Sequence, residues 1–207
     1  MQIGQYPATN PVYAFGRSSG IHPVAASFVA WMQTPEAQQL TGRSGFVGTQ
    51  LQRERMEDLG VAVIHTAAEE PDFDGAEFSS MMRELRDADR LSIVFRFLPG
   101  SATLDEASRQ NVKDLAGRLR RSEFDGQEVL MVGFADSIGP ADRNTVLSGR
   151  RAQAVLDVLK AEFDNETLAR LNLQSLSFGE QMPLDCNETD DGRANNRRVE
   201  VWVRTAS

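Results

Sequence analysis

The fold is decided by the stretch Gly133-Phe-Ala-Asp-Ser-Ile-Gly-Pro-Ala-Asp-Arg-Asn-Thr-Val-Leu-Ser-Gly-Arg-Arg-Ala152. It joins the end of an apolar run to an amphipathic helix through a turn rich in glycine and proline. The turn carries Asp136, and the 3.6-residue period places Arg151 on the apolar face of the helix. A cation that points toward a core needs a partner or a ligand there. Asp136 is the best candidate partner, because the turn delivers it to the N-terminal end of the helix, where an anion is favoured. An acid and a base at one small site suit a ligand that carries both an ammonium and a carboxylate.

Strand and helix signals alternate on both sides of this stretch. Runs of apolar and β-branched residues predict strands at 91–97, 127–133, 174–178 and 197–203. The capping-box sequence Thr103-Leu-Asp-Glu106 predicts one helix, and a second is expected from about Asp142 or Asn144 to Phe163, with a polar loop at 179–192. The order β-α-β-α-β-β predicts an α/β (α+β) two-layer sandwich with a mixed β-sheet, preceded by a mostly helical N-terminal segment.

The last strand divides its side chains between two faces with a period of two: Arg197, Val199, Val201 and Val203 on one, and Arg198, Glu200 and Trp202 on the other. The valines predict that the first face lies toward the core, and Arg197 opens that row. A second arginine therefore joins Asp136 and Arg151 at the rim of one core. The residues alone leave two interpretations open, a structural ion pair and a ligand pocket. Asn144 is likewise either a helix N-cap or a ligand contact.

The composition excludes several classes of function. The net charge of −8 argues against a general nucleic-acid binder and against docking on anionic lipid. No apolar run approaches the roughly 20 residues that span a bilayer. One cysteine and two distant histidines argue against a transition-metal site. Because the chain has no nucleophile elbow, no phosphate-binding loop and no Cys/His pair, we expect neither an enzyme nor a cofactor.

Charge and turn residues divide the chain into three parts. Residues 1–50 carry few charges, with one helix expected from Pro23 to about Met32 and another capped by Thr34. Residues 51–90 are expected to be a charged, partly helical linker, with helical segments at 50–59 and 77–87. Residues 91–207 form the third part, which contains the predicted sandwich.

The third part resembles the OmpA-like C-terminal domain, the peptidoglycan-associating module of Gram-negative envelopes. Five motifs carry the resemblance in the same order along residues 91–204: Phe97-x-x-Gly-Ser-Ala-x-Leu104, Gly133-Phe-Ala-Asp-Ser-Ile-Gly139, Asn144-x-x-Leu-Ser-x-x-Arg-Ala152, Gly179-Glu-x-x-Pro183 and Asn196-Arg-Arg-Val-Glu200.

The resemblance implies non-covalent binding of peptidoglycan through the diaminopimelate of the stem peptide, which anchors an envelope protein to the cell wall. It assigns the ammonium of the ligand to Asp136 and a carboxylate to Arg151, and it places Asn144 and Arg197 in the same pocket. The family usually has His-Thr before the aspartate, where this chain has Phe134-Ala135. The loss of that polar pair is expected to alter how Asp136 is oriented, but it removes neither charge.

Residues 5–50 are similar to the C-terminal end of periplasmic phosphate-type solute-binding proteins. The matching pieces are Tyr6-Pro-x-x-x-Pro11-Val-Tyr, Pro23-x-x-x-x-Phe28-Val-x-Trp, Thr34-Pro-Glu-Ala-Gln38 and Gly45-Phe-Val47. This second resemblance implies that 1–50 is a remnant of a lobe. Its apolar face is then expected to pack on the OmpA-like domain, to form a homodimer, or to stay disordered.

Two expectations about context follow from these resemblances. An alternative function is that of a solute receptor of a phosphate-type ABC transporter, with the OmpA-like domain as its wall tether. The resemblances imply a location in the periplasm or cell envelope. The first residues lack the features of a signal peptide, so we expect that segment to be lost or to lie upstream of Met1.

Overall fold

The computed structural model describes residues 20–44, 51–56, 58–59, 64, 74–98 and 101–206. The chain divides into two compact units, residues 1–52 and 53–207. Among the described residues, no helix combines the length and the apolar character that crossing a membrane requires.

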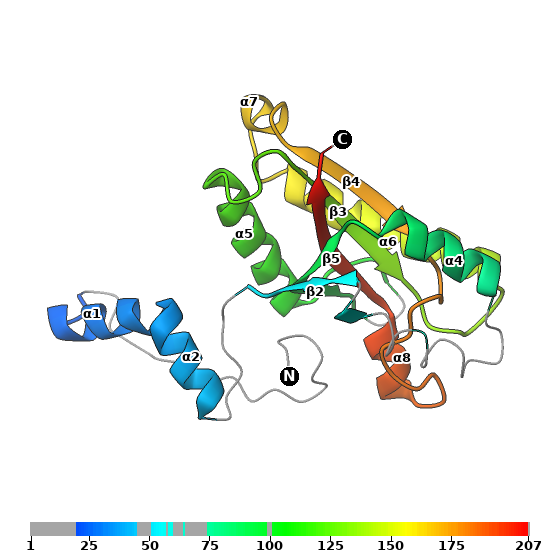
Figure 1. Ribbon diagram of the computed structural model, residues 1–207, viewed down its shortest axis with the longest axis horizontal. Coiled ribbons are helices and arrows are strands. Elements are labelled where there is room, and N and C mark those ends of the chain that lie inside the picture. The colour runs from blue at the N-terminus through cyan, green and yellow to red at the C-terminus, as the bar shows by residue number, and fades with distance from the viewer. Residues whose placement is uncertain are drawn as a thin grey trace. The chain divides into compact units, whose positions relative to one another are not determined.

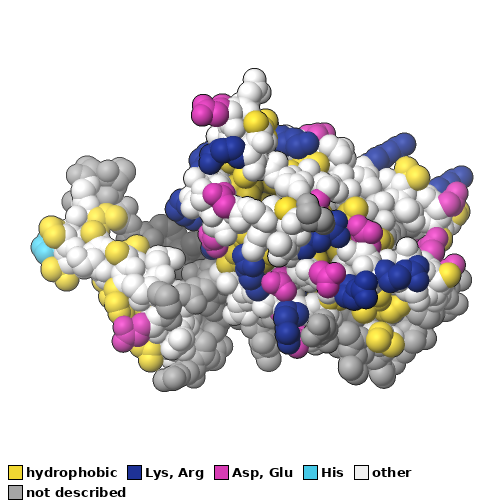
Figure 2. Space-filling model, turned by 45° about the horizontal axis from the view of Figure 1, so that its top comes forward, with side chains coloured by type: hydrophobic (Ala, Val, Ile, Leu, Met, Phe, Trp, Pro, Cys, Tyr) yellow, Lys and Arg dark blue, Asp and Glu magenta, His cyan; other side chains and the backbone are white. Residues whose placement is uncertain are grey.

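The first unit contains helices α1 (Pro23–Met32) and α2 (Pro35–Arg43), which begin where the sequence predicts. The side chain of Thr34 accepts a hydrogen bond from the backbone N–H of Ala37 at 3.4 Å, as expected of an N-cap. No residue of α1 is buried, and the rings of Phe28 and Trp31 stack at 5.8 Å on its surface. Figure 2 shows hydrophobic side chains gathered on the part of the surface that carries the one cyan histidine.

The second unit is built on one five-stranded sheet in the order β1-β2-β5-β3-β4. Its strands are β1 (Arg53–Arg55), β2 (Asp89–Arg96), β3 (Gln127–Phe134), β4 (Asn172–Ser177) and β5 (Arg198–Thr205). Only the β3–β4 pair is parallel, and β5 lies between β2 and β3 (Figure 1). The mixed sheet and the two-layer α/β architecture are confirmed.

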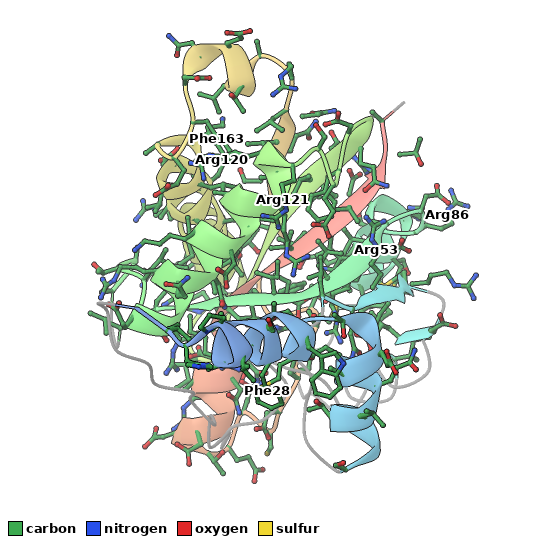
Figure 3. All side chains as sticks on the ribbon, turned by 90° about the vertical axis from the view of Figure 1, so that its left-hand side faces the viewer. Phe28, Arg53, Arg86, Arg120, Arg121 and Phe163 are labelled. Carbon is green, nitrogen blue, oxygen red and sulfur yellow. The ribbon has the colours of Figure 1, made fainter. Side chains whose placement is uncertain are left out.

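Two long helices cover one face of the sheet. Helix α5 (Glu106–Arg120) packs on β2, and α6 (Ala141–Lys160) packs on β3, β4 and β5. The N-cap of α5 is Asp105, whose carboxylate accepts from the N–H of Ser108, so the expectation of a Thr103 cap is wrong. Near the far end of both helices, the guanidinium of Arg120 lies 5.2 Å from the ring of Phe163 (Figure 3). This contact holds the end of α5 to the turn after α6.

The opposite face of the sheet is also buried, in addition to the valine face that the sequence places toward the core. Arg198, Glu200 and Trp202 are each fully buried. Helix α4 (Gly75–Glu84) supplies Phe78 and Met81 to a core cluster that includes Trp202. The register of the sheet explains why this face of β5 is buried, because each of these three residues is paired with a residue of β3 that belongs to the same core cluster.

The buried charges on this second face satisfy one another. The Arg198 guanidinium donates to Glu200 at 2.7 Å and stacks over the ring of Phe134 at 4.4 Å. The indole N–H of Trp202 donates to the other oxygen of Glu200 at 3.0 Å. Burial disfavours the charged form of Glu200, but the charges of Arg198 and Arg90 outweigh it and lower the pKa of this carboxyl. The two arginines therefore favour the ionised form of Glu200 in the folded protein.

Parts of the expected linker at 51–90 that the structure describes belong to this unit. Where a helix at 50–59 is expected, Arg53–Arg55 instead forms β1, because Glu54 reaches the buried Arg90 on β2 and Arg53 lies near Asp89. Helix α4 accounts for most of the predicted helix at 77–87. The assignment of 51–90 as a linker between domains stays a prediction, but its β1 and α4 belong to the sheet unit.

The loop after β4 contains a helix that the sequence analysis missed. Helix α8 (Asp190–Asn196) begins inside the expected polar loop at 179–192. Thr189 caps it by accepting from the N–H of Gly192 at 3.0 Å, and two aspartates occupy its first turn. The signal was present as Thr189-Asp-Asp. The helix ends at Asn196, directly before Arg197, and so it sets where that arginine enters the candidate site.

Candidate functional site

The candidate site begins with a close approach between a strand and a helix. A Cβ added at Gly133, near the end of β3, would lie 2.2 Å from the backbone oxygen of Ser148 on α6. Glycine is therefore required for α6 to rest directly on the strand. This contact places the face of α6 that carries Asn144, Ser148 and Arg151 against the end of the sheet, and all three residues are buried.

Asp136 lies in the turn between β3 and α6 and has two hydrogen-bond partners. Its Oδ1 accepts from the backbone N–H of Ile138 at 3.2 Å, within the turn. Its Oδ2 accepts from Nη1 of Arg197 at 2.6 Å. The expected partner of Asp136 was Arg151, so this part of the prediction is wrong. Arg197 takes that place because the end of α8 brings it to the turn.

Arg151 is buried but lacks partners for two of its donors. Among the described residues, no acceptor meets Nε or Nη1, although both atoms are buried. The guanidinium lies 5.5 Å from the ring centroid of Phe97, at the end of β2. Desolvation and the charge of Arg197 lower the pKa of Arg151, and Asp136 opposes them. Arg151, Arg197 and Asp136 are thus electrostatically coupled.

Asn144 is not the N-cap of α6, because Pro140 holds that position and makes no side-chain cap. The amide of Asn144 instead donates to Oε2 of Glu180 at 2.7 Å. Glu180 follows Gly179, whose N–H donates to Oγ of Ser148 at 3.2 Å. The structure therefore joins Asn144 to the loop after β4. Sequence reasoning missed Glu180 as its partner, although the Gly179-Glu motif contains it.

A buried amide holds the far side of the site. The Oδ1 of Asn196 accepts from the N–H groups of Leu184 and Asp185, at 2.8 Å and 3.1 Å. Its Nδ2 donates to Oδ1 of Asn187 at 2.9 Å, and the same oxygen accepts from the N–H of Ser137 at 3.3 Å. Asn196 directly precedes Arg197, and through Asn187 it is connected to Ser137, which directly follows Asp136. It therefore connects the two segments that carry the ion pair.

The substitution before Asp136 has a structural explanation. Phe134 is paired with Arg198 across the strands and packs over its guanidinium, in the core on the α4 side of the sheet. Ala135 donates its N–H to the carbonyl of Gly179 at 2.7 Å. Phe134 therefore packs in the core cluster on the α4 side of the sheet, and Ala135 binds the loop after β4. Asp136 is oriented by Ile138 and Arg197.

The arrangement can bind charged groups of both signs. It presents two guanidinium groups, one carboxylate and an aromatic ring in a largely buried setting. Among the residues that the structure describes, no group of three acidic, histidine or cysteine side chains could hold a metal ion. Cys186 is exposed and takes no part in the site. The role of Asp136, Arg151, Asn144 and Arg197 as ligand contacts stays a prediction.

Known proteins match the part of the chain that contains the candidate site. The model of the OmpA family matches residues 96–197. Outer membrane porin F of Pseudomonas aeruginosa is 35% identical over 114 residues, which cover 55% of this chain and 31% of the porin. The chain thus spans about a third of the length of that porin. The peptidoglycan-binding protein ArfA of Mycobacterium bovis is 36% identical over 75 residues, 36% of this chain and 22% of ArfA.

A shorter relative is covered over most of its length. The putative lipoprotein YfiB of Escherichia coli is 30% identical over 115 residues, which cover 56% of this chain and 69% of YfiB. The matched part of the family model holds the turn with Asp136, the helix with Arg151 and the arginine that pairs with Asp136. On these grounds the chain is a member of the OmpA family.

Proposed function

We propose that the protein binds peptidoglycan non-covalently through the diaminopimelate of the stem peptide and thereby anchors an envelope protein to the cell wall. The observation that carries this proposal is Arg151, a buried arginine beside Asp136 with two donors that meet no acceptor among the described residues. A buried cation of this kind costs stability in the empty protein. A ligand carboxylate would supply the missing acceptors.

The chemistry of diaminopimelate matches the charges of the site. Its free end carries one ammonium and one carboxylate on the same carbon. The planar fork of Arg151 suits a carboxylate, which it can hold through two parallel hydrogen bonds. Asp136 supplies the negative charge for the ammonium, and Arg197 adds a second cation within reach of the same ligand.

Family membership supports the same proposal. ArfA is named a peptidoglycan-binding protein, and the other relatives are an outer membrane porin and a putative lipoprotein. We place the protein in the periplasm or cell envelope on this basis, with peptidoglycan as its partner. The relatives are named for binding or for their place in the envelope, and the proposed role is binding without catalysis.

A sedimentation assay with purified sacculi that contain diaminopimelate tests the proposal. The wild-type protein should sediment with the sacculi, and Asp136→Ala and Arg151→Ala should each reduce the bound fraction. Arg150→Ala is the matched control, because Arg150 is exposed and its substitution removes the same charge from the same helix. Undiminished sedimentation of both site variants would assign Asp136 and Arg151 a purely structural role.

The alternative of a phosphate-type solute receptor stays a prediction, as does a homodimer through the N-terminal segment. Both depend on residues 1–50, of which 1–19 and 45–50 lie outside the described residues. Within the described part, the exposed apolar side chains that such a dimer could bury include Val24, Phe28 and Trp31.

A further inference from the structure

The charges of the candidate site are unequally satisfied. The carboxylate of Asp136 already has an ion-pair partner in Arg197, at 2.6 Å. Arg151 has no such partner among the described residues, and two of its donors are left without acceptors. Arg151, Arg197 and Asp136 together carry an excess of one positive charge. A ligand anion would therefore pair with the donors of Arg151 that lack an acceptor.

The two ends of the site also differ in depth. Arg151 is 4% exposed, so its guanidinium marks the closed end. The side chain of Arg197 is 30% exposed, so the ion pair marks the more open end at Arg197, although Asp136 itself is buried, with 8% of the residue exposed. A ligand that places its carboxylate against Arg151 and its ammonium near Asp136 would therefore have the ammonium nearer to solvent.

We propose that the pocket selects stem peptides by a free carboxylate at the diaminopimelate terminus and tolerates acylation of the amine beside it. This inference rests on the proposed function and adds a rule for which stems are bound. A peptide cross-link converts that amine into an amide, whereas amidation converts the carboxylate into a neutral carboxamide. The pocket would thus accept cross-linked stems and reject amidated ones.

The asymmetry follows from what each modification leaves unpaired. A carboxamide removes the anion, so Arg151 stays a buried cation without a counter-charge, and the amide nitrogen brings further donors to a site that already lacks acceptors. Acylation removes the ammonium, but Asp136 keeps Arg197 as its partner and loses little. The acyl group would also extend from the open end, where a substituent meets less protein.

Four synthetic tripeptides that end in diaminopimelate provide the test, with affinities measured by calorimetry on the full chain. The first is the unmodified (free) peptide. The second has a carboxamide in place of the carboxylate at the free end of diaminopimelate, the one that shares its carbon with the free amine. The third is N-acetylated at that amine, and the fourth carries both modifications. We expect the carboxamide to bind about 10- to 100-fold more weakly than the free peptide, as befits the loss of a charged hydrogen-bond acceptor. We expect N-acetylation to cost less than about fivefold.

Two results overturn the inference in distinguishable ways. If the free peptide binds but N-acetylation weakens it as much as amidation does, the selection rule is wrong and the proposed function stands. If none of the four peptides binds, the proposed function and the selection rule both fall.

A variant identifies the residue responsible. Arg151→Gln should bind the free peptide and the carboxamide with nearly equal affinity, because the neutral amide no longer distinguishes them. Arg150→Gln should keep the full discrimination. A thermal melt of both variants confirms that they are folded at the temperature of the titration. Discrimination that survives in folded Arg151→Gln would show that another group reads the carboxylate.

Discussion

Replacing Arg151 by methionine should stabilise the empty protein and abolish ligand binding at the same time. The two orphaned donors of its guanidinium are each expected to cost about 1–2 kcal/mol in the folded state, near the low end for buried unsatisfied groups. The stacking on Phe97, lost on substitution, is worth up to about 2 kcal/mol when desolvated. Methionine keeps an unbranched apolar stem in the same space. The net expectation is a gain of about 1 kcal/mol.

The measurement is a pair of experiments on the same purified variants. Chemical denaturation of the second unit should show the gain as a raised midpoint, and thermal unfolding as a rise of about 2–4 °C. Sedimentation with sacculi should fall to background. Arg150→Met is the control, and this exposed position is expected to change stability by less than about 0.5 kcal/mol.

The sign of the stability change decides whether the reasoning is right. A loss of more than about 1 kcal/mol in Arg151→Met, relative to Arg150→Met, would mean that the guanidinium is an integral part of the fold. Arg151→Lys separates charge from geometry, because it keeps the cation but lacks the planar fork. It should retain most of the stability of the wild type and bind the stem peptide more weakly.

Three further predictions concern the scaffold. Gly133→Ala should destabilise the protein by at least about 1–3 kcal/mol, since its Cβ would overlap Ser148, whereas Gly117→Ala on α5, where a Cβ meets only the end of Arg121 at 3.5 Å, should stabilise by up to about 1 kcal/mol in urea denaturation. Because the pKa of Glu200 is lowered in the folded state, its contribution to stability is present above the unfolded value of about 4.3 and lost as pH falls through the folded value, so urea midpoints measured from pH 5 downward should fall more steeply than in Glu200→Gln. Asn196→Ala should cost about 1–3 kcal/mol by stranding two backbone N–H groups, and should weaken stem-peptide binding in calorimetry, while an unchanged affinity would show that Asp136 keeps its position without the amide.

Local signals account for the parts of the fold that the sequence predicts well. The strand expected at 91–97 is observed as Asp89–Arg96, and the one at 127–133 as Gln127–Phe134. Helix α6 begins and ends within three residues of its expected bounds. These elements carry their periodicity and their end signals within a few residues of chain, so no distant contact is needed to recognise them.

The missed features depend on contacts between distant parts of the chain. Glu54 becomes part of a strand by reaching Arg90, 36 residues away. The alternation along β5 identifies two faces, but the burial of the Arg198 face depends on α4, which precedes β2 in the chain. Composition alone makes such a face look solvated, because it carries charges that are paired only in the folded protein.

The candidate site shows the same division. The period of α6 correctly places Arg151 among buried residues. The alternation along the last strand also brings Arg197 to the rim near Asp136, but it does not show which arginine pairs with Asp136, because Arg197 lies 61 residues further on and is positioned by the unexpected helix α8. The correction matters for function, since it leaves Arg151 as the group with unmet hydrogen bonds.

The short strand β1 has a mechanical consequence. It joins the sheet unit to everything N-terminal to it, and it is held to β2 by three antiparallel residue pairs and the Glu54–Arg90 contact. Tension applied from the N-terminal side, on a protein held at the candidate site, would reach Arg53 first and peel β1 from the sheet edge one pair at a time. The four remaining strands stay paired to one another without β1. Release of the edge strand would then lengthen the chain under load while the candidate site at the end of β3 stays folded.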